Sequence, residues 1–384
     1  MTRHSPIRLR RIPTWLLILC IVGSGLGTTR AQTAIPAKSR LTRGANITRW
    51  FWLMPETTTA HYQSYMTDAD FKMLNDLGVT FVRLVLTPSL FFNPATPAQL
   101  DMQMIGYVDS ALKRFNAAHI AVMLDMHDDD NKPKLEIDNH YQEAFITFWK
   151  AFATHYKASD PSFVLFELLN EPIFSAHPEQ WEALQTRLLA AVRDVVPEHT
   201  IILTGARWSA IETLVKIKPV ADPNVIYTFH FYEPFTFTHQ GATWTNTPGQ
   251  PELRNVPYPN DRDRCQSALN ATDGAAHRLL SSYCFGKAWD ATAIDTLIAP
   301  VVAWTKQYST TAFVGEFGVY CPNALAADRE TWLRDTRLAF EKAGFGWSVW
   351  GYDECFGLQR KLNDDGRVTI DEGAVQALGL RQVQ

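Results

Sequence analysis

The chain has 384 residues, of which 46% are hydrophobic and 20% are charged. This composition is typical of a globular protein with a large apolar core. The formal net charge is −4, so the sequence lacks the basic excess of nucleic-acid-binding proteins, and we expect no nucleic acid as a partner.

The first 31 residues resemble a signal peptide. A basic segment, 1–13, precedes an apolar run, 14–27, and small residues lie near a plausible cleavage point after Ala31. The apolar run is short for a membrane span, which favours a cleaved signal over the alternative of a retained anchor. We therefore expect a secreted or periplasmic protein, with a short leader over 32–40 and no stable membrane insertion after cleavage.

From residue 41 onward, apolar and β-branched runs alternate with amphipathic stretches of helical spacing. Near-continuous apolar runs are typical of parallel strands that are covered on both faces. The predicted strands are 41–48, 79–86, 120–127, 163–170, 200–205, 225–232, 311–318 and 345–352. The predicted helices are 68–78, 99–119, 140–156, 179–196 and 328–344. Eight strands alternating with helices predict an α/β fold, a (β/α)8 TIM barrel in a single domain over 41–384.

The segment 233–289 is too long for a simple connection and predicts an enlarged loop after the sixth strand. Removal of Cys20 with the signal leaves an even number of cysteines, which in an oxidising compartment predicts two disulfides with three possible pairings. The four cysteines are Cys265, Cys284, Cys321 and Cys355. We favour a bond between the first two, inside the loop, and one between the last two. Four free thiols are the alternative.

Polar or aromatic side chains stand at the ends of six predicted strands. They are Arg83, His127, Asn170 with Glu171, His230 with Tyr232, Glu316 and Trp350. Each has a structural explanation when taken singly, as an ion-pair partner, a buried histidine or a core ring. Because catalytic residues of such barrels lie at the carboxyl ends of the strands, the set together predicts one site.

Two of these residues, Glu171 and Glu316, are carboxylic acids. Two carboxyl groups that flank a glycosidic bond are the minimal machinery for glycoside hydrolysis, and their separation decides whether configuration is retained or inverted. One acid must be protonated and the other ionised, so we expect a raised pKa for Glu171 and a pKa held down by Arg83 for Glu316. Two acids in structural ion pairs are the alternative.

Six motifs follow one another along the chain. In order they are "FVRLVL", "LDMHD", "LLNEP", "FHFYEP", "VGEFG" and "WSVWGY". Together they resemble glycoside hydrolase family 5, the cellulase-like family, over roughly 41–360. The family belongs to the clan with catalytic glutamates at the ends of barrel strands four and seven. The resemblance implies retention of configuration through a covalent glycosyl-enzyme, with no metal and no cofactor.

The resemblance also implies a role for each residue. Glu171 matches the acid/base and Glu316 the nucleophile, while Asn170 matches the residue that binds the sugar 2-hydroxyl. The remaining matches are Arg83 and Tyr232 beside Glu316, His230 near Glu171, His127 in contact with the sugar, and Trp350 as the floor of the site.

Further aromatic residues follow the predicted strands. Trp50 and Trp52 come after the first strand, Trp208 after the fifth, and Trp244 in the long loop. An indole ring can stack on the apolar face of a sugar, and packing in the core is the alternative for each. Trp50 and Trp208 are the two that we favour as sugar platforms.

The sequence therefore predicts a monomeric, retaining β-glycosidase acting on a β-linked polysaccharide or oligosaccharide, first of all an endo-β-1,4-glucanase. A β-1,3-glucanase, a β-mannanase, an exo-glucosidase or a transglycosylase would use the same catalytic set. Two alternatives of other classes are a non-catalytic carbohydrate-binding barrel, which should have lost part of this set, and a metal-dependent hydrolase, which needs clustered ligands.

Overall fold

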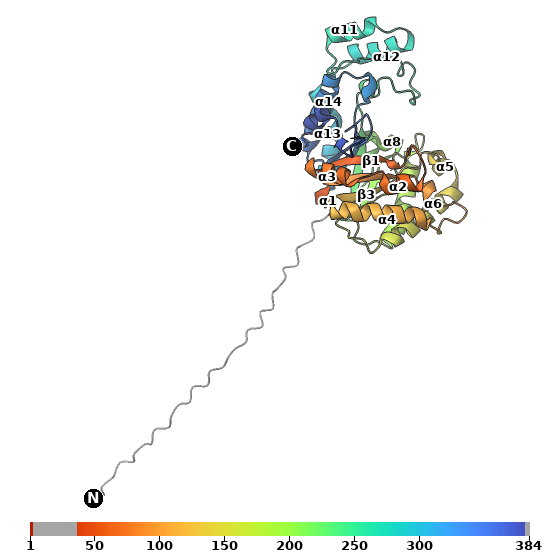
Figure 1. Cartoon of the computed structure of the whole chain (residues 1–384), viewed down its shortest axis with the longest axis vertical. Helices are drawn as coiled ribbons and strands as arrows, with labels where there is room; N and C mark the ends of the chain where they lie inside the picture. The colour runs from red at the N-terminus through yellow and green to blue at the C-terminus, as the bar shows by residue number, and fades with distance from the viewer. Residues whose placement is uncertain (3–36, 381–384) are drawn as a thin grey trace. The chain divides into compact units, whose positions relative to one another are not determined.

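Eight parallel strands close into a barrel, in which each strand pairs with the next one along the chain and β8 pairs with β1 (Figure 1). The computed structural model describes residues 1–2 and 37–380. The strands are β1 (Arg43–Phe51), β2 (Phe81–Leu86), β3 (Ala121–Met126), β4 (Val164–Glu167), β5 (Ile201–Thr204), β6 (Val225–Phe231), β7 (Ala312–Phe317) and β8 (Trp347–Val349). The predicted (β/α)8 barrel is thus confirmed.

Helices alternate with the strands and bury their apolar faces against the barrel. The long ones are α3 (Asp68–Asp76), α4 (Met102–Ala117), α6 (Asn139–Tyr156), α7 (Pro178–Arg193), α13 (Ala291–Tyr308) and α14 (Ala326–Ala343). The sequence predicted all of these except α13, whose apolar pattern contains Pro300. Asp101 and Asp138 cap α4 and α6 by accepting hydrogen bonds from backbone amides of the first turn, which explains why these helices begin there.

The remaining elements are short. They are α1 (Ala37–Arg40), α2 (Thr59–Ser64), α5 (Lys132–Ile137), α8 (Ala206–Ser209), α9 (Ile211–Leu214), α15 (Glu372–Ala377), the 3₁₀ turns Pro88–Leu90 and Cys321–Asn323, and a hairpin of β9 (Lys361–Leu362) and β10 (Val368–Thr369). Several of them lie in the βα loops and line the carboxyl end of the barrel, where a site is expected.

The segment between β6 and α13 contains three helices of its own. They are α10 (Phe235–Thr238), α11 (Arg262–Asn270) and α12 (Gly274–Phe285). A disulfide between Cys265 and Cys284 joins α11 to α12, and Arg264 forms an ion pair with Asp328 of α14. This βα connection is therefore an ordered helical hairpin anchored to the barrel's outer layer.

The second disulfide, Cys321–Cys355, links the loops after β7 and β8. Both favoured pairings are therefore present. The proposed signal segment, 1–31, lies outside the described residues apart from its first two. Within the described part of the chain, no helix combines the length and apolarity that a membrane span requires.

The barrel interior is apolar at one end and polar at the other. A separate apolar cluster fills the end at which the strands begin; it consists of Leu41, Phe81, Ala121, Met123, Leu165, Ile202, Ile226 and Phe313. Since this cluster closes the barrel at its amino-terminal end, polar groups are gathered at the carboxyl end, where the strands finish.

Most strands are one to three residues shorter than predicted at one or both ends. The difference matters at β4, which ends at Glu167, so Asn170 and Glu171 belong to the following loop. Glu171 has φ 46°, in the left-handed region. This unusual conformation turns the chain sharply at the residue that carries the site's first carboxyl group.

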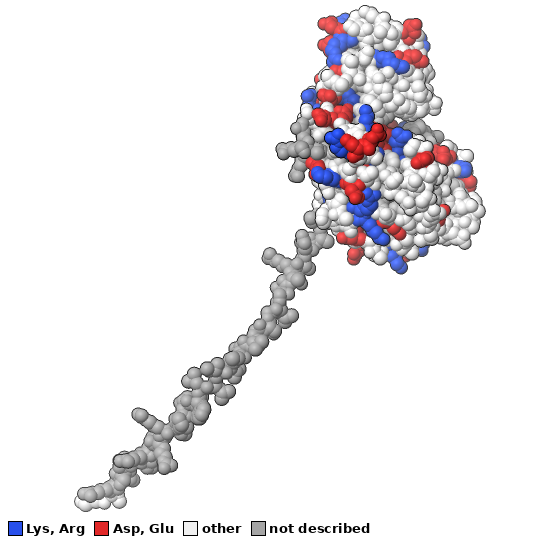
Figure 2. Space-filling view, viewed as in Figure 1, with Lys and Arg blue, Asp and Glu red and all other residues white. Residues whose placement is uncertain are grey.

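The visible surface carries mixed charge. Lys and Arg are interspersed with Asp and Glu over the face shown in Figure 2, without an extended basic patch on that face. This agrees with the net charge of −4.

Candidate active site

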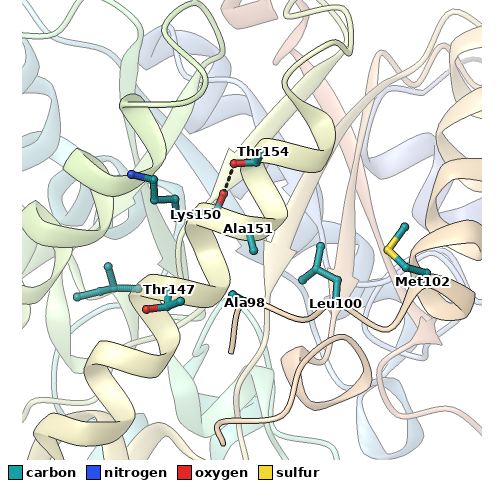
Figure 3. A pocket seen from close by; sticks show the side chains of 8 residues that line it. Ala98, Leu100, Met102, Thr147, Lys150, Ala151 and Thr154 are labelled. Atoms are coloured by element: carbon teal, nitrogen blue, oxygen red, sulfur yellow. Dashed lines mark hydrogen bonds between the residues drawn. The ribbon is translucent and has the colours of Figure 1, made fainter. Parts of the chain in front are cut away.

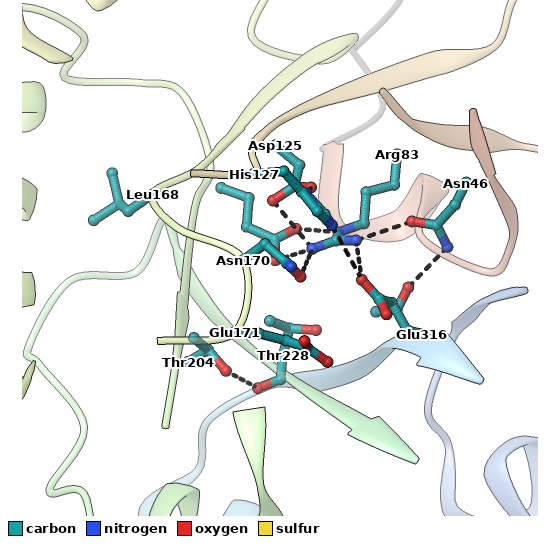
Figure 4. Close-up of polar contacts among 12 residues, drawn as sticks. Asn46, Arg83, Asp125, His127, Leu168, Asn170, Glu171, Thr204, Thr228 and Glu316 are labelled. Atoms are coloured by element: carbon teal, nitrogen blue, oxygen red, sulfur yellow. Dashed lines mark hydrogen bonds and ion pairs between the residues drawn. The ribbon is translucent and has the colours of Figure 1, made fainter. Parts of the chain in front are cut away.

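A fully buried arginine, Arg83 on β2, organises the carboxyl end of the barrel (Figure 4). Its Nη1 lies 2.7 Å from Oε1 of Glu316, and its Nε lies 2.7 Å from Oε2 of Glu167. Its Nη2 lies 3.0 Å from Oδ1 of Asp125 and also donates to Oδ1 of Asn170 at 3.0 Å. One cation thus holds three buried acids and the asparagine of "LLNEP" in fixed positions.

Sequence reasoning missed three members of this network. Asp125 and Glu167 support Arg83 from β3 and β4, and Asn46 on β1 accepts from its Nη1 at 3.0 Å. Burial raises the pKa of Asp125 to about 7, while Arg83 opposes the rise. The signal was present in the sequence, because an acid inside an apolar parallel strand is costly unless it is paired.

Glu316 at the end of β7 receives hydrogen bonds on both carboxyl oxygens. Arg83 donates to Oε1, and the hydroxyl of Tyr232 donates to Oε2 at 2.9 Å. His127 lies beside it, with Nε2 3.7 Å from Oε1. Burial raises the pKa of Glu316 to about 7, and His230 and Arg83 act in the opposite direction. Donors on both oxygens orient the group and favour its ionised form.

Glu171 faces this carboxyl group from the loop after β4. Its Oε1 lies 2.8 Å from Nδ1 of His230, a histidine whose pKa burial lowers to about 4. His230 is therefore neutral at neutral pH. Burial also raises the pKa of Glu171, and nearby Lys132 opposes that rise.

The two carboxyl groups are close enough to titrate as a pair. One oxygen of Glu171 and one of Glu316 lie within 4.8 Å of each other, and each negative charge disfavours the other. The expectation that Arg83 holds the pKa of Glu316 below its ordinary value is not met, because burial outweighs Arg83. Arg83 and Tyr232 nevertheless donate to Glu316 and favour its ionised form. When the pair holds a single proton, these contacts favour its location on Glu171.

The two glutamates open into a cleft of about 870 Å³. Trp350, which follows β8, stacks on His127 with ring centroids 5.6 Å apart, and Trp52 meets Trp350 edge-on at 5.5 Å. The described residues that line the cleft are Arg49, Trp52, Leu53, Glu171, Tyr232, His239, Trp244, Glu316, Tyr320, Trp350, Asp353, Glu354, Cys355, Phe356, Gln359, Arg360 and Lys361. Flat aromatic faces beside hydrogen-bonding groups suit a sugar ring.

The structure corrects the prediction for Trp50. This side chain is 2% exposed and donates from Nε1 to the backbone oxygen of Tyr62, among the helices outside the barrel. The pairing of β1 with β2 shifts register between Ile47 and Phe51, and such an irregularity turns the following side chains to the opposite face. Trp52, two residues later, reaches the cleft instead.

The other predicted aromatic residues are more exposed. Trp208 is 53% exposed, and its amide donates to the backbone oxygen of Pro172, next to Glu171. Trp244 is 55% exposed and lines the cleft, where its ring lies 4.8 Å from that of Tyr320. The structure therefore places the backbone of Trp208 next to Pro172, outside the residues that line the cleft, and places Trp244 on the wall formed by the long loop.

Glu171, His230 and Glu316 also offer three potential metal-ligand atoms within 4.8 Å of one another. The carboxylate of Glu316 already accepts from Tyr232 and Arg83, and a guanidinium so close would repel a cation. The arrangement therefore fits acid–base and nucleophilic chemistry better than metal binding.

A second hollow lies on the outside of the barrel, between the segment before α4 and the helix α6 (Figure 3). It is lined by Ala98, Leu100, Met102, Ile146, Thr147, Lys150, Ala151 and Thr154. Its lining holds one charged side chain, Lys150, and no carboxyl group, so it offers no acid–base machinery comparable to the cleft.

A (β/α)8 barrel with two facing carboxyl groups after its fourth and seventh strands fits the chemistry of a glycoside hydrolase. The family model described as cellulase (glycosyl hydrolase family 5) matches residues 44–355. The chain belongs to this family, as the motifs predicted.

Named relatives match most of the chain. Endoglucanase 3 of Fibrobacter succinogenes is 27% identical over 365 residues, which cover 90% of this chain and 53% of the relative. The chain thus spans about half the length of that relative. Endoglucanase C of Acetivibrio thermocellus is 22% identical over 347 residues, 88% of this chain and 98% of the relative.

Solved structures show the same fold. Cellulose synthase subunit Z (CcsZ) of Clostridioides difficile superposes with a TM-score of 0.69 at 22% identity, covering 88% of this chain and 99% of that one. Endoglucanase Cel5A of Thermotoga maritima has a TM-score of 0.69 at 24% identity, covering 90% and 100%.

Proposed function

We propose that this glycoside hydrolase is a retaining enzyme that cleaves β-1,4-glucan internally. The observation that carries the proposal is the short distance between Glu171 and Glu316. One carboxyl oxygen of each lies within 4.8 Å of the other. Retaining enzymes have carboxyl groups about 5–5.5 Å apart, whereas inverting enzymes need about 6.5–9.5 Å to admit a water between them.

In the first step, a carboxylate oxygen of Glu316 attacks the anomeric carbon. The bond from that carbon to the leaving oxygen breaks, and Glu171 transfers its proton to this oxygen. The product is a glycosyl ester of Glu316 and a shortened chain. Arg83 and Tyr232 hold the nucleophile in position and offset its negative charge until it is consumed.

In the second step, Glu171 acts as a base. It removes a proton from a water molecule, whose oxygen attacks the anomeric carbon and releases Glu316 as a carboxylate. Asn170 directs its amide towards the sugar 2-hydroxyl, because its Oδ1 is already bound to Arg83. That contact is expected to strengthen towards the transition state.

Several neighbours would hold the substrate. His127 contacts the sugar beside Glu316, Trp350 forms the floor beneath that ring, and His230 orients Glu171. Trp208, next to Pro172, would stack on the leaving-group side. Trp52 takes the place at the rim that the sequence had suggested for Trp50.

The names of the relatives support β-1,4-glucan as the substrate, since two of them are endoglucanases. A second candidate is cleavage of short cellodextrins. Cellodextrinase A of Ruminococcus flavefaciens is 27% identical over 335 residues, covering 84% of this chain and 87% of the relative.

The deciding experiment is reducing-sugar release from β-1,4-glucan, mixed-linkage glucan, β-1,3-glucan, β-mannan and soluble cellodextrins, with Glu316→Gln as the control. Release from the first two substrates that disappears in the control supports the proposal. Release from β-1,3-glucan or β-mannan alone would replace the substrate and keep the mechanism. Release from cellodextrins only would favour the second candidate.

We further propose that the protein acts outside the cytoplasm as a monomer, with a cleaved segment 1–31, a leader over 32–40 and the catalytic domain over 41–384. The two disulfides support a location outside the cytoplasm, because such bonds persist in oxidising compartments. Retention of the mass of residues 1–31 in the exported protein would contradict the cleavage.

A further inference from the structure

The loop after β3 contains three consecutive acids, Asp128, Asp129 and Asp130, and then Lys132. Lys132 is buried, and the catalytic steps proposed above do not use it. Its Nζ lies 2.6 Å from Oδ1 of Asp129, which is its one ion pair in the described part of the chain. A buried ammonium group is costly unless it has a defined partner, so this pair requires an explanation.

The first of the three acids fixes the backbone of the loop. Asp128 is buried and accepts from the hydroxyl of Tyr141 at 2.6 Å and from the side-chain amide of Asn131 at 3.0 Å. Its backbone oxygen accepts from the amide of Lys132 at 2.8 Å, where α5 begins. The side chains of Asp129 and Lys132 are therefore presented from a defined position.

The second acid connects Lys132 to the cleft. The indole Nε1 of Trp52 donates to Oδ2 of Asp129 at 3.0 Å, while Oδ1 lies against the ammonium group. The ring of Trp52 lies 5.1 Å from that of His127 and 5.5 Å from that of Trp350, between centroids. One carboxylate thus joins a buried cation to an aromatic ring of the active site. Hydrogen bonds that involve an ionised group are roughly twice as strong as neutral ones.

Trp52 depends on such an anchor because its side chain is only partly buried. A ring at the rim of a cleft that is free to change rotamer must be ordered when the substrate binds, and the lost freedom opposes binding. A ring that is already held loses less entropy. The contact with Asp129 therefore favours a cleft that is shaped before the sugar arrives.

The use of an ion pair as the anchor has an electrostatic reason. Burial raises the pKa of Glu171, Lys132 opposes this rise, and Asp129 adds to it. A lone cation or a lone acid in this loop would therefore change the proton affinity of Glu171 in one direction. The pair sets one charge against the other beside this group.

We propose that Lys132 and Asp129 are positioning residues of the active site. Lys132 holds the carboxylate of Asp129, and this carboxylate holds the indole of Trp52 in the orientation that the bound sugar requires. Both residues act through Trp52 and do not contact the substrate themselves. The proposal rests on the proposed function, since it takes a β-glucosyl chain as the ligand of the cleft.

The test measures kcat/KM on the dinitrophenyl β-cellobioside. Its leaving group departs without protonation, so a changed pKa of Glu171 has little effect on the first step. Lys132→Met and Asp129→Ala should each lower kcat/KM by about three- to tenfold, because Trp52 is no longer held. Trp52→Phe keeps a ring but loses the N–H, and it should lower kcat/KM by a similar factor.

A double variant tests whether Lys132 acts through Trp52. When Trp52→Phe is already present, Lys132→Met should change kcat/KM by less than about twofold, because residues that act through one contact are not additive. Unchanged kcat/KM in the single variant Lys132→Met, or a full further loss in the double variant, would overturn the positioning role while the proposed function stands.

Lys150→Met is the matched control, because it makes the same change in an exposed ion pair between α6 and Asp194. It should leave kcat/KM within about twofold of the wild type. Thermal melting shows whether each variant folds. Asp129→Ala decides the proposal if Lys132→Met does not fold, since the side chain of Asp129 is 42% exposed.

The indole N–H signal of Trp52 provides a readout that does not depend on activity. In nuclear magnetic resonance spectra of protein with isotope-labelled tryptophan, Trp52→Phe identifies this signal by its disappearance. A hydrogen-bonded proton resonates downfield, so the signal should move upfield in Lys132→Met and Asp129→Ala and stay in place in Lys150→Met. An unmoved signal in the first two variants would overturn the positioning role. A folded wild type that is inactive on the cellobioside and on all glucans would overturn the proposed function, and the indole signal would then decide the positioning role by itself.

Discussion

The centre of the site and the wall of its cleft are built on different principles. Around Arg83, every charged group is buried and has a partner, so position and charge are set by the fold. Along the wall, Trp52 is partly exposed and donates from Nε1 to Asp129 at 3.0 Å, and Trp244 is 55% exposed. Changes at the centre should therefore affect chemistry and folding, whereas changes on the wall should affect substrate binding alone.

The largest expected effect is the loss of kcat/KM when either glutamate is replaced, and the choice of substrate should distinguish the two roles. Glu316→Gln should lower kcat/KM by roughly 10⁴-fold or more on every substrate, because the proposed nucleophile is lost. Glu171→Gln should be comparably inactive on glucan and far less impaired on a dinitrophenyl cellobioside, whose leaving group departs without protonation. Steady-state kinetics on both substrates measures this, and equal losses for Glu171→Gln on the two would contradict its role as the acid.

The next effect concerns the stability of the centre. Arg83→Met leaves Glu316, Glu167 and Asp125 buried without their cation, and we expect a loss of about 3–5 kcal/mol in the free energy of unfolding. Urea denaturation measures this loss of stability as a lower midpoint concentration of urea, with the slope of the free energy against urea concentration unchanged. Lys342→Met is the control, because its ion pair with Asp295 is exposed and should contribute below about 1 kcal/mol. Similar midpoints for the two variants would show that the Arg83 network does not stabilise the fold.

A matched pair of tryptophans sharpens the contrast between core and wall. Trp50→Ala should cost about 3–5 kcal/mol in the free energy of unfolding, because a large buried ring is lost. Trp52→Ala should leave the melting temperature nearly unchanged and lower kcat/KM on glucan by about tenfold, through lost stacking. Thermal melting and kinetics on both variants test this, and the reverse pattern would contradict the corrected assignment.

The smallest expected effect is a shift in the pH profile. The proposed mechanism needs Glu316 ionised and Glu171 protonated, so activity should fall on the acid side as Glu316 gains a proton and on the basic side as Glu171 loses one. The hydroxyl of Tyr232 stabilises the ionised form of Glu316, so Tyr232→Phe should raise the pKa of Glu316. The acid limb of kcat/KM should then move to higher pH while the basic limb stays in place. If neither limb of the pH profile moves in Tyr232→Phe, the hydrogen bond from Tyr232 does not control the pKa of Glu316.

Much of the site was predictable because its signals are local. A strand pattern followed by an acid, a histidine or an asparagine marks a barrel end, and this rule located Glu171, Glu316, His230 and Tyr232. Asp125 and Glu167 were missed because they lie inside the predicted strands 120–127 and 163–170, so a rule based on strand ends does not select them. Their pairing with Arg83 joins separate strands of the barrel, and no local pattern reports such a contact.

By itself, the sequence determined the eight-stranded barrel, the motifs of the family, and the residues that face one another across the site. It could do so because strand periodicity and strand ends are properties of short segments. Only the tertiary structure decided the orientation of Trp50 and the raised pKa of Glu316. Each depends on a register shift or on burial, and both arise only when distant segments pack together.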